Sequence, residues 1–193
     1  MSDGDLTLRH HLLDPNFWRP RLRALERAPR KLVMAPRPDL SRPGIEVLGL
    51  RVRGHDGRAL SALLGRSAFA RRGDFVRVRP AWPGHPEVLD WASLQDGGTD
   101  VVLLPFADEQ RSASIGEDGG QPGRAVGRRL EDRVLDVIRL AEVACSIESV
   151  PCGAVRFGWG RSHECEDAFT LAALIRDQGW LDENCRGPHG AAG

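Results

Sequence analysis

The chain has 193 residues, of which 41% are hydrophobic and 28% charged, a composition typical of one globular domain with its own core. Its 27 basic and 27 acidic residues cancel, so no basic field predicts binding to nucleic acid or to a membrane surface. No apolar stretch approaches the ~20 residues that a membrane-spanning helix needs. The polar N-terminus, MSDGDLTLRHHLL, lacks the apolar core of a signal peptide. We therefore expect a cytoplasmic protein, and its four cysteines are expected to be free thiols.

Residues 1–44 predict a helix followed by a linker. The segment DPNFWRPRLRALERA is typical of a short helix, with Pro20 near its start, where proline is tolerated. The segment APRPDLSRPG, residues 35–44, has no hydrophobic periodicity and is punctuated by prolines, which predicts a linker.

A hairpin and a third strand follow the linker. Residues 47–53 and 59–64 are strand-like, and the GHDG between them is a turn signal because Asp-Gly tolerates positive φ. FVRVRP predicts a strand over 75–79. After the loop WPGHP, the segment PEVLDWASLQDGG predicts a short helix with Pro86 in its first turn.

The second half alternates strands and helices. The segment TDVVLLPF predicts a strand over 100–105, in which the apolar run VVLL is typical of a strand buried on both faces. The polar, glycine-rich stretch 107–124 predicts a loop. Residues 154–159 predict the last strand. The helix before that strand places apolar residues at helical spacing, namely Leu130, Val134, Val137, Ile138 and Ala141.

We expect an α/β fold in three layers, with a mostly parallel sheet of about five strands and helices on both faces. The leading hairpin adds antiparallel strands at one side. This domain covers residues 45–180, and residues 181–193 predict a disordered tail.

The stretch FGWGRSHECEDAFTLAAL, residues 157–174, has the outline of a nucleophile elbow, in which a strand passes a serine to a helix through a G-x-S-x-G turn. Gly160 and Ser162 match this pattern, but Glu164 replaces the last glycine. Ser162 is therefore either a serine nucleophile or the N-cap of the following helix, where Glu164 and Glu166 would favour the helix dipole.

Several segments, in the same chain order, resemble the acetylxylan esterase and cephalosporin-C deacetylase family of the α/β-hydrolase fold. NFW at 16–18 is similar to the family's N-terminal helix, GIEVLGLRVRGHDGRALSALL to its opening hairpin, and LEDRVLDVIRLAEVACSIESV to the helix before its elbow. AAL at 172–174 lies at the family's usual distance after the serine. The resemblance covers roughly residues 14–180 and implies the N-terminal part of an esterase, with Ser162 in the nucleophile position.

The other members of a hydrolase triad have no clear counterpart in the chain. A serine hydrolase of this fold takes its acid and then its histidine from later strands. The residues after Leu174 include Asp182, Glu183 and His189 but predict no further strand. We therefore expect an acyl-ester hydrolase relative with impaired catalysis, acting on a small ester if it is active.

Further residues are candidates for the site around Ser162. The resemblance implies an oxyanion loop at Gly84 and His85, although an exposed loop histidine explains His85 as well. Trp82 and Trp159 follow strand ends, where an α/β sheet forms its crevice, and His163 adjoins the elbow. His163 and Cys165 lack the spacing of a zinc site, so we expect neither metal nor cofactor.

The alternative is a non-catalytic protein that binds a partner or a second copy of itself. Residues 166–178 predict a helix that is apolar nearly all round, including Phe169 and Leu174. Such a helix requires burial on more than one face. We therefore also expect a homo-oligomer or a protein partner.

Overall fold

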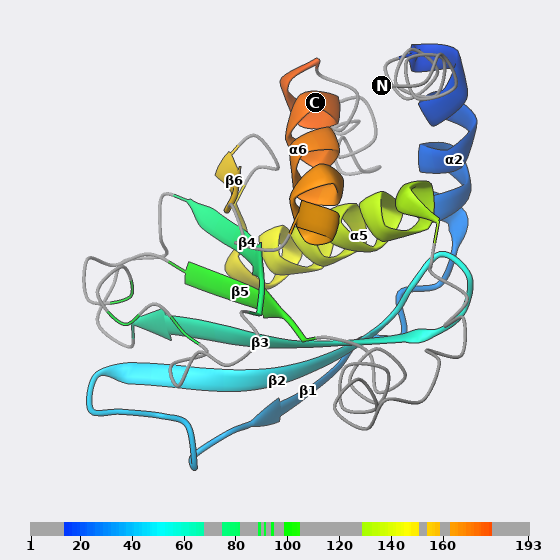
Figure 1. Ribbon diagram of the computed structural model, residues 1–193. Coiled ribbons are helices and arrows are strands. Elements are labelled where there is room, and N and C mark those ends of the chain that lie inside the picture. Colours follow the sequence, from blue (N-terminus) through cyan, green and yellow to red (C-terminus); the bar gives the residue numbers. More distant parts are fainter. Residues whose placement is uncertain are drawn as a thin grey trace, which may run out of the picture.

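The structure is a computed structural model that describes residues 14–67, 75–81, 89, 91, 94, 99–104, 129–150, 154–158 and 163–178, with backbone alone at 103 and 163–166. Within these residues, no helix combines the length and the apolar character that crossing a bilayer would require. The described residues form one sheet and three long helices (Figure 1).

The sheet has six strands in the order β1-β2-β3-β5-β4-β6. The last three strands along the chain, β4, β5 and β6, are mutually parallel, because β4 pairs in parallel with both of the others. The pairs β1–β2, β2–β3 and β3–β5 are antiparallel. The prediction of one α/β sheet with its last three strands parallel is confirmed. The strands are β1 (Val33–Pro36), β2 (Ile45–Arg53), β3 (Ala59–Ser67), β4 (Val76–Pro80), β5 (Thr99–Leu103) and β6 (Val155–Phe157).

The sheet has one strand more than predicted. β1 lies partly within the segment interpreted as a linker, and all four of its residues are exposed. A strand exposed on both faces shows no alternation of apolar and polar residues, so the usual signal was absent. Because Arg37 donates its amide to Val47, alternate residues of β1 face β2, and Pro36 faces the outer edge. A proline offers no N–H there, which protects this edge from further pairing.

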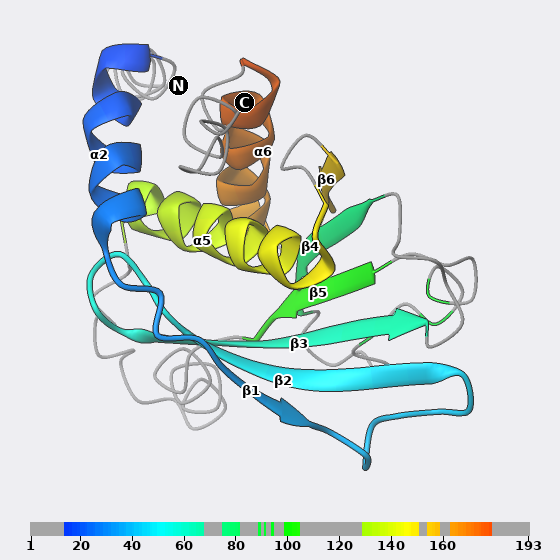
Figure 2. The same ribbon diagram turned by 180° about the vertical axis from the view of Figure 1, so that it is seen from behind.

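Three helices cover one face of the sheet (Figures 1 and 2). α5 (Leu130–Glu148) crosses that face and packs against both α2 (Pro15–Arg27) and α6 (His163–Asp177). The predicted apolar stripe of α5 is therefore too narrow. Leu135, Leu140 and Val143 are buried as well, because helices cover α5 on the sides that do not face the sheet.

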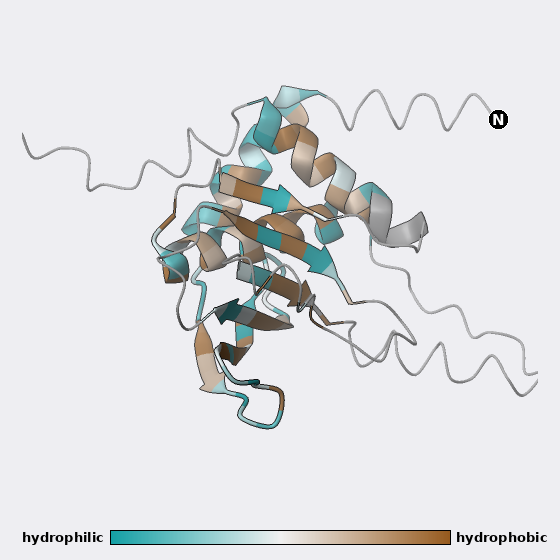
Figure 3. Cartoon of the chain, turned by 90° about the vertical axis from the view of Figure 1, so that its left-hand side faces the viewer, coloured by the Kyte–Doolittle hydropathy of each residue, from teal (hydrophilic) through white to brown (hydrophobic). Residues whose placement is uncertain are grey.

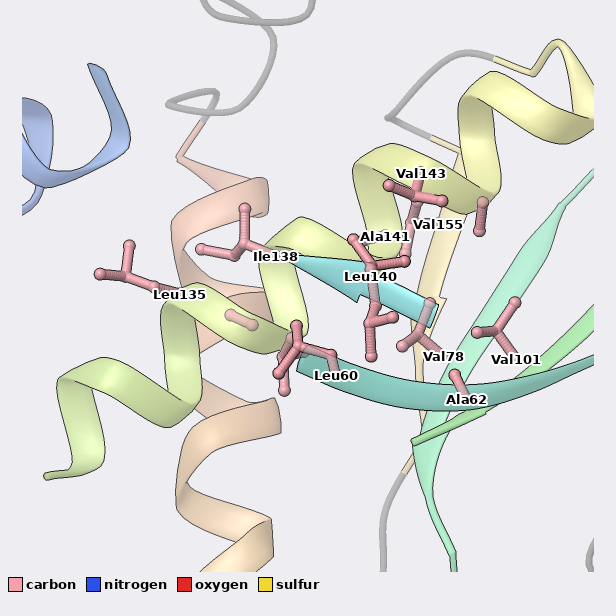
Figure 4. Close-up of a cluster of buried hydrophobic side chains, with 14 of the residues drawn as sticks. Leu60, Ala62, Val78, Val101, Leu135, Ile138, Leu140, Ala141, Val143 and Val155 are labelled. Carbon is pink, nitrogen blue, oxygen red and sulfur yellow. The ribbon is translucent and has the colours of Figure 1, made fainter. Parts of the chain in front are cut away.

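The main core lies between α5 and the strands (Figure 4). Even-numbered residues of β2 and β3 face α5, and polar and apolar residues alternate along the strands (Figure 3), as the two-residue period of a strand dictates. Deleting one of the large buried side chains of such a core costs about 2–5 kcal/mol. The residues that meet there include Leu60, Ala62, Val78, Val101, Leu135, Ile138, Leu140, Ala141 and Val155.

A second, smaller core occupies the opposite face of the sheet. Leu89 and Leu94 cover Leu63 and Val102 there, and Trp91 and Leu94 have helical backbone. The prediction of helices on both faces is confirmed.

α6 needs less external cover than its sequence predicts. Its Phe169 is only 3% exposed and packs in the main core, together with Ala168, Ala172 and Ile175. Leu174, on the other side of the helix, is 39% exposed. The expectation that the helix lacks cover is therefore wrong for Phe169 and stands for Leu174.

Candidate functional site

The predicted passage from strand to helix is present at the carboxyl edge of the parallel strands. β6 ends at Phe157 and α6 begins at His163, so Ser162 is the residue directly before the helix. Phe157 is in register with Val78 of β4, so the ends of these two strands lie side by side. A serine that follows β6 leaves the sheet where ligands of α/β proteins bind.

Close packing at the end of β6 depends on a glycine. Gly158 continues the pairing by donating its amide to the carbonyl of Val78 at 2.8 Å. A Cβ at this position would lie 3.0 Å from the Cβ of Arg79, tighter than ordinary van der Waals contact. Gly158 therefore lets the chain leave β6 close to β4.

Most of the predicted site residues lie outside the described residues. Ser162 and Trp159 follow β6, and the segment with Trp82, Gly84 and His85 follows β4. Both segments leave from the carboxyl ends of neighbouring strands, at Gly158 and Ala81. The topology therefore starts the two predicted halves of the site side by side. Of the candidates, only His163 belongs to a described element, as the first residue of α6.

A buried ion pair connects β4 and β5 on the face opposite α5. Arg79 donates from Nε and Nη2 to the carboxylate of Asp100, at 3.1 and 2.8 Å. The side chains are 8% and 1% exposed. Arg77 adds a second guanidinium, its Nε 3.7 Å from the same carboxylate. Arg79 directly precedes Pro80 at the end of β4, whereas Asp100 is the second residue of β5 and is in register with Arg77.

A second polar cluster lies at the carboxyl edge of the parallel strands, on the turn between β2 and β3. The Nε2 of His55 is 2.9 Å from Oδ1 of Asp132, and its Nδ1 is 3.6 Å from Oδ1 of Asp136. The Asp136 carboxylate makes the largest contribution to a raised pKa of His55, against the opposing effect of burial, and the charge of Asp132 adds to it. The ring is hydrogen-bonded through Nε2 to Asp132, and its Nδ1 faces the Asp136 carboxylate beyond hydrogen-bond distance, so a carboxylate lies beside each ring nitrogen.

Cysteine chemistry is excluded for Cys145 by its surroundings. Burial, and then the charge of Glu142, raise the pKa of its thiol to about 12. A thiol with this pKa is protonated at neutral pH and does not supply the thiolate that a nucleophile needs. In the described part of the chain, His, Cys, Asp and Glu side chains form no group of three that could hold a metal ion.

Sequence reasoning missed both polar clusters. The GHDG segment was interpreted only as a turn, and Asp132 lies 77 residues away from His55. The signal that could have found the cluster is the i, i+4 pair of aspartates at the start of α5, which places Asp132 and Asp136 on one face of the helix. Asp100 could have been suspected because it stands at the start of an otherwise apolar strand, whereas Arg79 belongs to an alternating Val-Arg run that gives no such signal.

No protein-family model matches the chain, and no curated protein does. Solved structures do match. An acetyl xylan esterase from Paenibacillus sp. R4 is similar with a TM-score of 0.57 and 18% identity, over 82% of this chain and 55% of that one. Acetyl Xylan Esterase 1 from Thermoanaerobacterium sp. JW/SL YS485 is similar with a TM-score of 0.50 and 15% identity, over 81% of this chain and 55% of that one.

The likeness shows that the chain has an α/β-hydrolase-like fold, as the resemblance in the sequence implied. The chain spans about half the length of the two esterases that it matches. Function is carried by sites and not by folds, so the activity of those enzymes does not pass to this chain with the fold.

Proposed function

We propose that this chain is an acyl-ester hydrolase relative that has Ser162 in the nucleophile position and does not turn over esters by itself. The observation that carries the proposal is the passage from β6 to α6. It stands at the carboxyl edge of three parallel strands, in a fold similar to that of acetyl xylan esterases. In α/β-hydrolases the nucleophile occupies this passage.

The impairment follows from the groups that a serine nucleophile needs. A serine hydroxyl must lose its proton to a nearby base, usually a histidine oriented by an acid. His55 is the one histidine whose side chain the structure describes, and Asp132 occupies its Nε2. Glu164 also replaces the last glycine of the elbow, and a carboxylate beside the developing oxyanion opposes it.

The substrate class of an active form would be a small acetyl ester. The two esterases named above act on acetylated xylan by their names, and an acetyl group needs only a small acyl pocket. We propose that Gly84 and His85 lie near the oxyanion position, that Trp82 and Trp159 supply an apolar wall, and that His163 adjoins the serine. No cofactor or metal is part of this proposal.

Hydrolysis of 4-nitrophenyl acetate by the purified 193-residue chain tests the proposal. We expect nitrophenol release at the rate of buffer alone, with no change in Ser162→Ala. The matched control is Ser146→Ala, which removes an exposed serine from α5. Turnover that is lost in Ser162→Ala and retained in Ser146→Ala would contradict the proposal and identify Ser162 as an active nucleophile.

A second candidate function is that of a non-catalytic module that pairs with a copy of itself or with a protein partner. Two observations favour it: among the described residues, β6 pairs with β4 alone, and Leu174 of α6 is 39% exposed. An unpaired strand edge and an exposed apolar side chain are each typical of an interaction site. This candidate is compatible with the first, since a catalytically impaired hydrolase fold remains available for binding.

A further inference from the structure

We propose that His55, Asp132 and Asp136 form a pH-sensitive latch that fastens the turn between β2 and β3 to the start of α5 in mildly acidic solution and loosens in alkaline solution. The latch is independent of the proposed function, because it uses none of the residues assigned to the serine site.

The latch joins two elements that are distant in the sequence. His55 stands on the turn, and both aspartates stand on α5, in its first and second turns. The 2.9 Å contact of Nε2 with Asp132 and the 3.6 Å approach of Nδ1 to Asp136 place one carboxylate at each end of the imidazole. Only the protonated ring can donate from both nitrogens.

The fit of the turn against α5 is close. A Cβ on Gly54 would lie 2.6 Å from Oδ1 of Asp136, so this carboxylate packs directly against the turn backbone. Asp136 is 1% exposed and His55 is half-buried. In such surroundings the charge state of the ring acts strongly on the aspartates, because water screens the interaction less than at the surface.

Other groups around the ring act on its protonation in both directions. Asp56, on the same turn, adds to the attraction but also approaches Arg58 at 3.5 Å. On α5, the positive end of the helix dipole disfavours an imidazolium. Arg139, also on α5, interacts electrostatically with Asp136. Burial opposes protonation as well. The carboxylates outweigh these effects, since the pKa of His55 is raised above its ordinary value of 6.5.

The direction of the pH effect follows from this raised pKa. A group whose pKa is higher in the folded than in the unfolded protein stabilises the fold fully below its unfolded value, and loses this contribution as the pH rises through its folded value. Above that value, a neutral ring keeps one donor and turns a lone pair toward the other carboxylate. The turn then separates from α5 more readily.

The latch stands at the carboxyl edge of the parallel strands. β3 runs antiparallel to β5, and Ala62 is in register with Leu103 at the end of β5. The turn before Ala59 therefore projects from the carboxyl edge, the edge at which β6 passes to α6. A change in the docking of the turn would therefore affect the carboxyl edge of the sheet.

Nuclear magnetic resonance titration of the histidine rings in the full chain tests the latch. We expect His55 to titrate above its ordinary pKa, and Asp132→Asn to lower its pKa. The matched control is Asp39→Asn, the same substitution at an exposed carboxylate that pairs with Arg37, which should leave the titration of His55 unchanged. A wild-type His55 that titrates at or below 6.5, or that ignores Asp132→Asn, would overturn the proposal.

Amide exchange gives a second readout, which also serves if Asp132→Asn does not fold. The amide of Gly54 donates to Arg58 across the turn, and the amide of Ile45 closes a separate turn with Arg42. After correction for intrinsic exchange, we expect protection of Gly54 to fall about tenfold from pH 6 to pH 8.5, the scale of one hydrogen bond to a charged group. Ile45 should show no such fall. An equal fall for Gly54 in His55→Gln would overturn the latch, and a flat profile in that variant would support it.

Discussion

Arg79 and Asp100 form a bidentate ion pair inside the protein, across the parallel strands β4 and β5. The Nη2 of Arg79 is 2.8 Å from Oδ2 of Asp100, and its Nε lies 3.1 Å from both carboxylate oxygens. Both residues are buried, in contrast with Arg37 and Asp39, which form a similar pair in solvent. A buried pair of this kind holds each partner in place, because neither charge can be left alone in the interior.

Replacing one partner of this pair should strongly destabilise the fold. We expect Arg79→Met to lower the free energy of unfolding by about 3–5 kcal/mol, because it leaves the charge of Asp100 buried without its main partner. Denaturant unfolding at neutral pH measures the loss. The double variant with Asp100→Leu should recover part of it, since it removes both charges of the pair, while Arg77, whose side chain is 23% exposed, loses its contact with the carboxylate.

The control for this prediction is Arg37→Met, at the exposed pair. We expect the unfolding midpoint of this variant to match that of the parent chain, because water and salt screen an exposed pair. Equal midpoints for Arg79→Met and Arg37→Met would show that the buried pair does not stabilise the fold.

Gly65 tests the cover on the second face of the sheet. Its Cβ position lies 2.9 Å from Leu94 and 3.2 Å from Leu89, so Gly65→Ala overfills this small core. We expect a loss of about 1–3 kcal/mol in the free energy of unfolding, measured by denaturant or by heat.

Gly49, on the neighbouring strand β2, is the matched control. An added Cβ there meets its nearest atom at 3.5 Å, an ordinary contact, and a glycine in a strand is entropically unfavourable. Gly49→Ala should therefore be neutral or slightly stabilising. If Gly65→Ala is as harmless, Leu89 and Leu94 do not cover that face closely.

The two sides of α6 should respond differently to substitution. Phe169→Ala removes a ring from the core and should cost about 3–5 kcal/mol, whereas Leu174→Ala changes a side chain at the surface and should alter the unfolding midpoint little. Denaturant unfolding separates the two. A loss at Leu174 equal to that at Phe169 would mean that Leu174 is covered in solution.

Association is the corresponding test of the exposed side of α6. We expect light scattering over a dilution series to show a concentration-dependent oligomer or aggregate, and Leu174→Glu to shift the chain toward the monomer. Gln178→Glu adds the same charge to an exposed position nearby and should leave association unchanged. A monomer at every concentration would refute association through this helix.

Local sequence signals predicted most of the fold. The apolar alternation of β2 and β3, the Asp-Gly turn and the periodicity of α5 each depend on residues close in the chain, so propensity and pattern were sufficient. β1 was not predicted because its residues are exposed on both faces. The full burial of α5 was not predicted because it depends on which helices pack beside it. Neither property is local.

Sequence signals pointed to some of the polar residues, but their partners could not be predicted, for the same reason. His55 meets Asp132 across 77 residues, and Arg79 meets Asp100 because β4 and β5 lie side by side. Strand order decides the second contact, and the packing of α5 across the sheet decides the first. The position of Ser162 was predicted from its motif. The strand before it and the helix after it are present in the structure, and Ser162 itself lies outside the described residues.

The most direct test of the account is the covalent state of Ser162 after exposure to an activated acetyl ester. The purified chain would be mixed with 4-nitrophenyl acetate, quenched at short times and analysed by intact-mass and peptide mass spectrometry, beside Ser162→Ala. Our account predicts no burst of nitrophenol and no acetyl group on Ser162, because a serine needs a base to deprotonate it and the one histidine side chain among the described residues, His55, is bound to Asp132. A stoichiometric burst, with acetylation of Ser162 in the wild-type chain and none in Ser162→Ala, would contradict it.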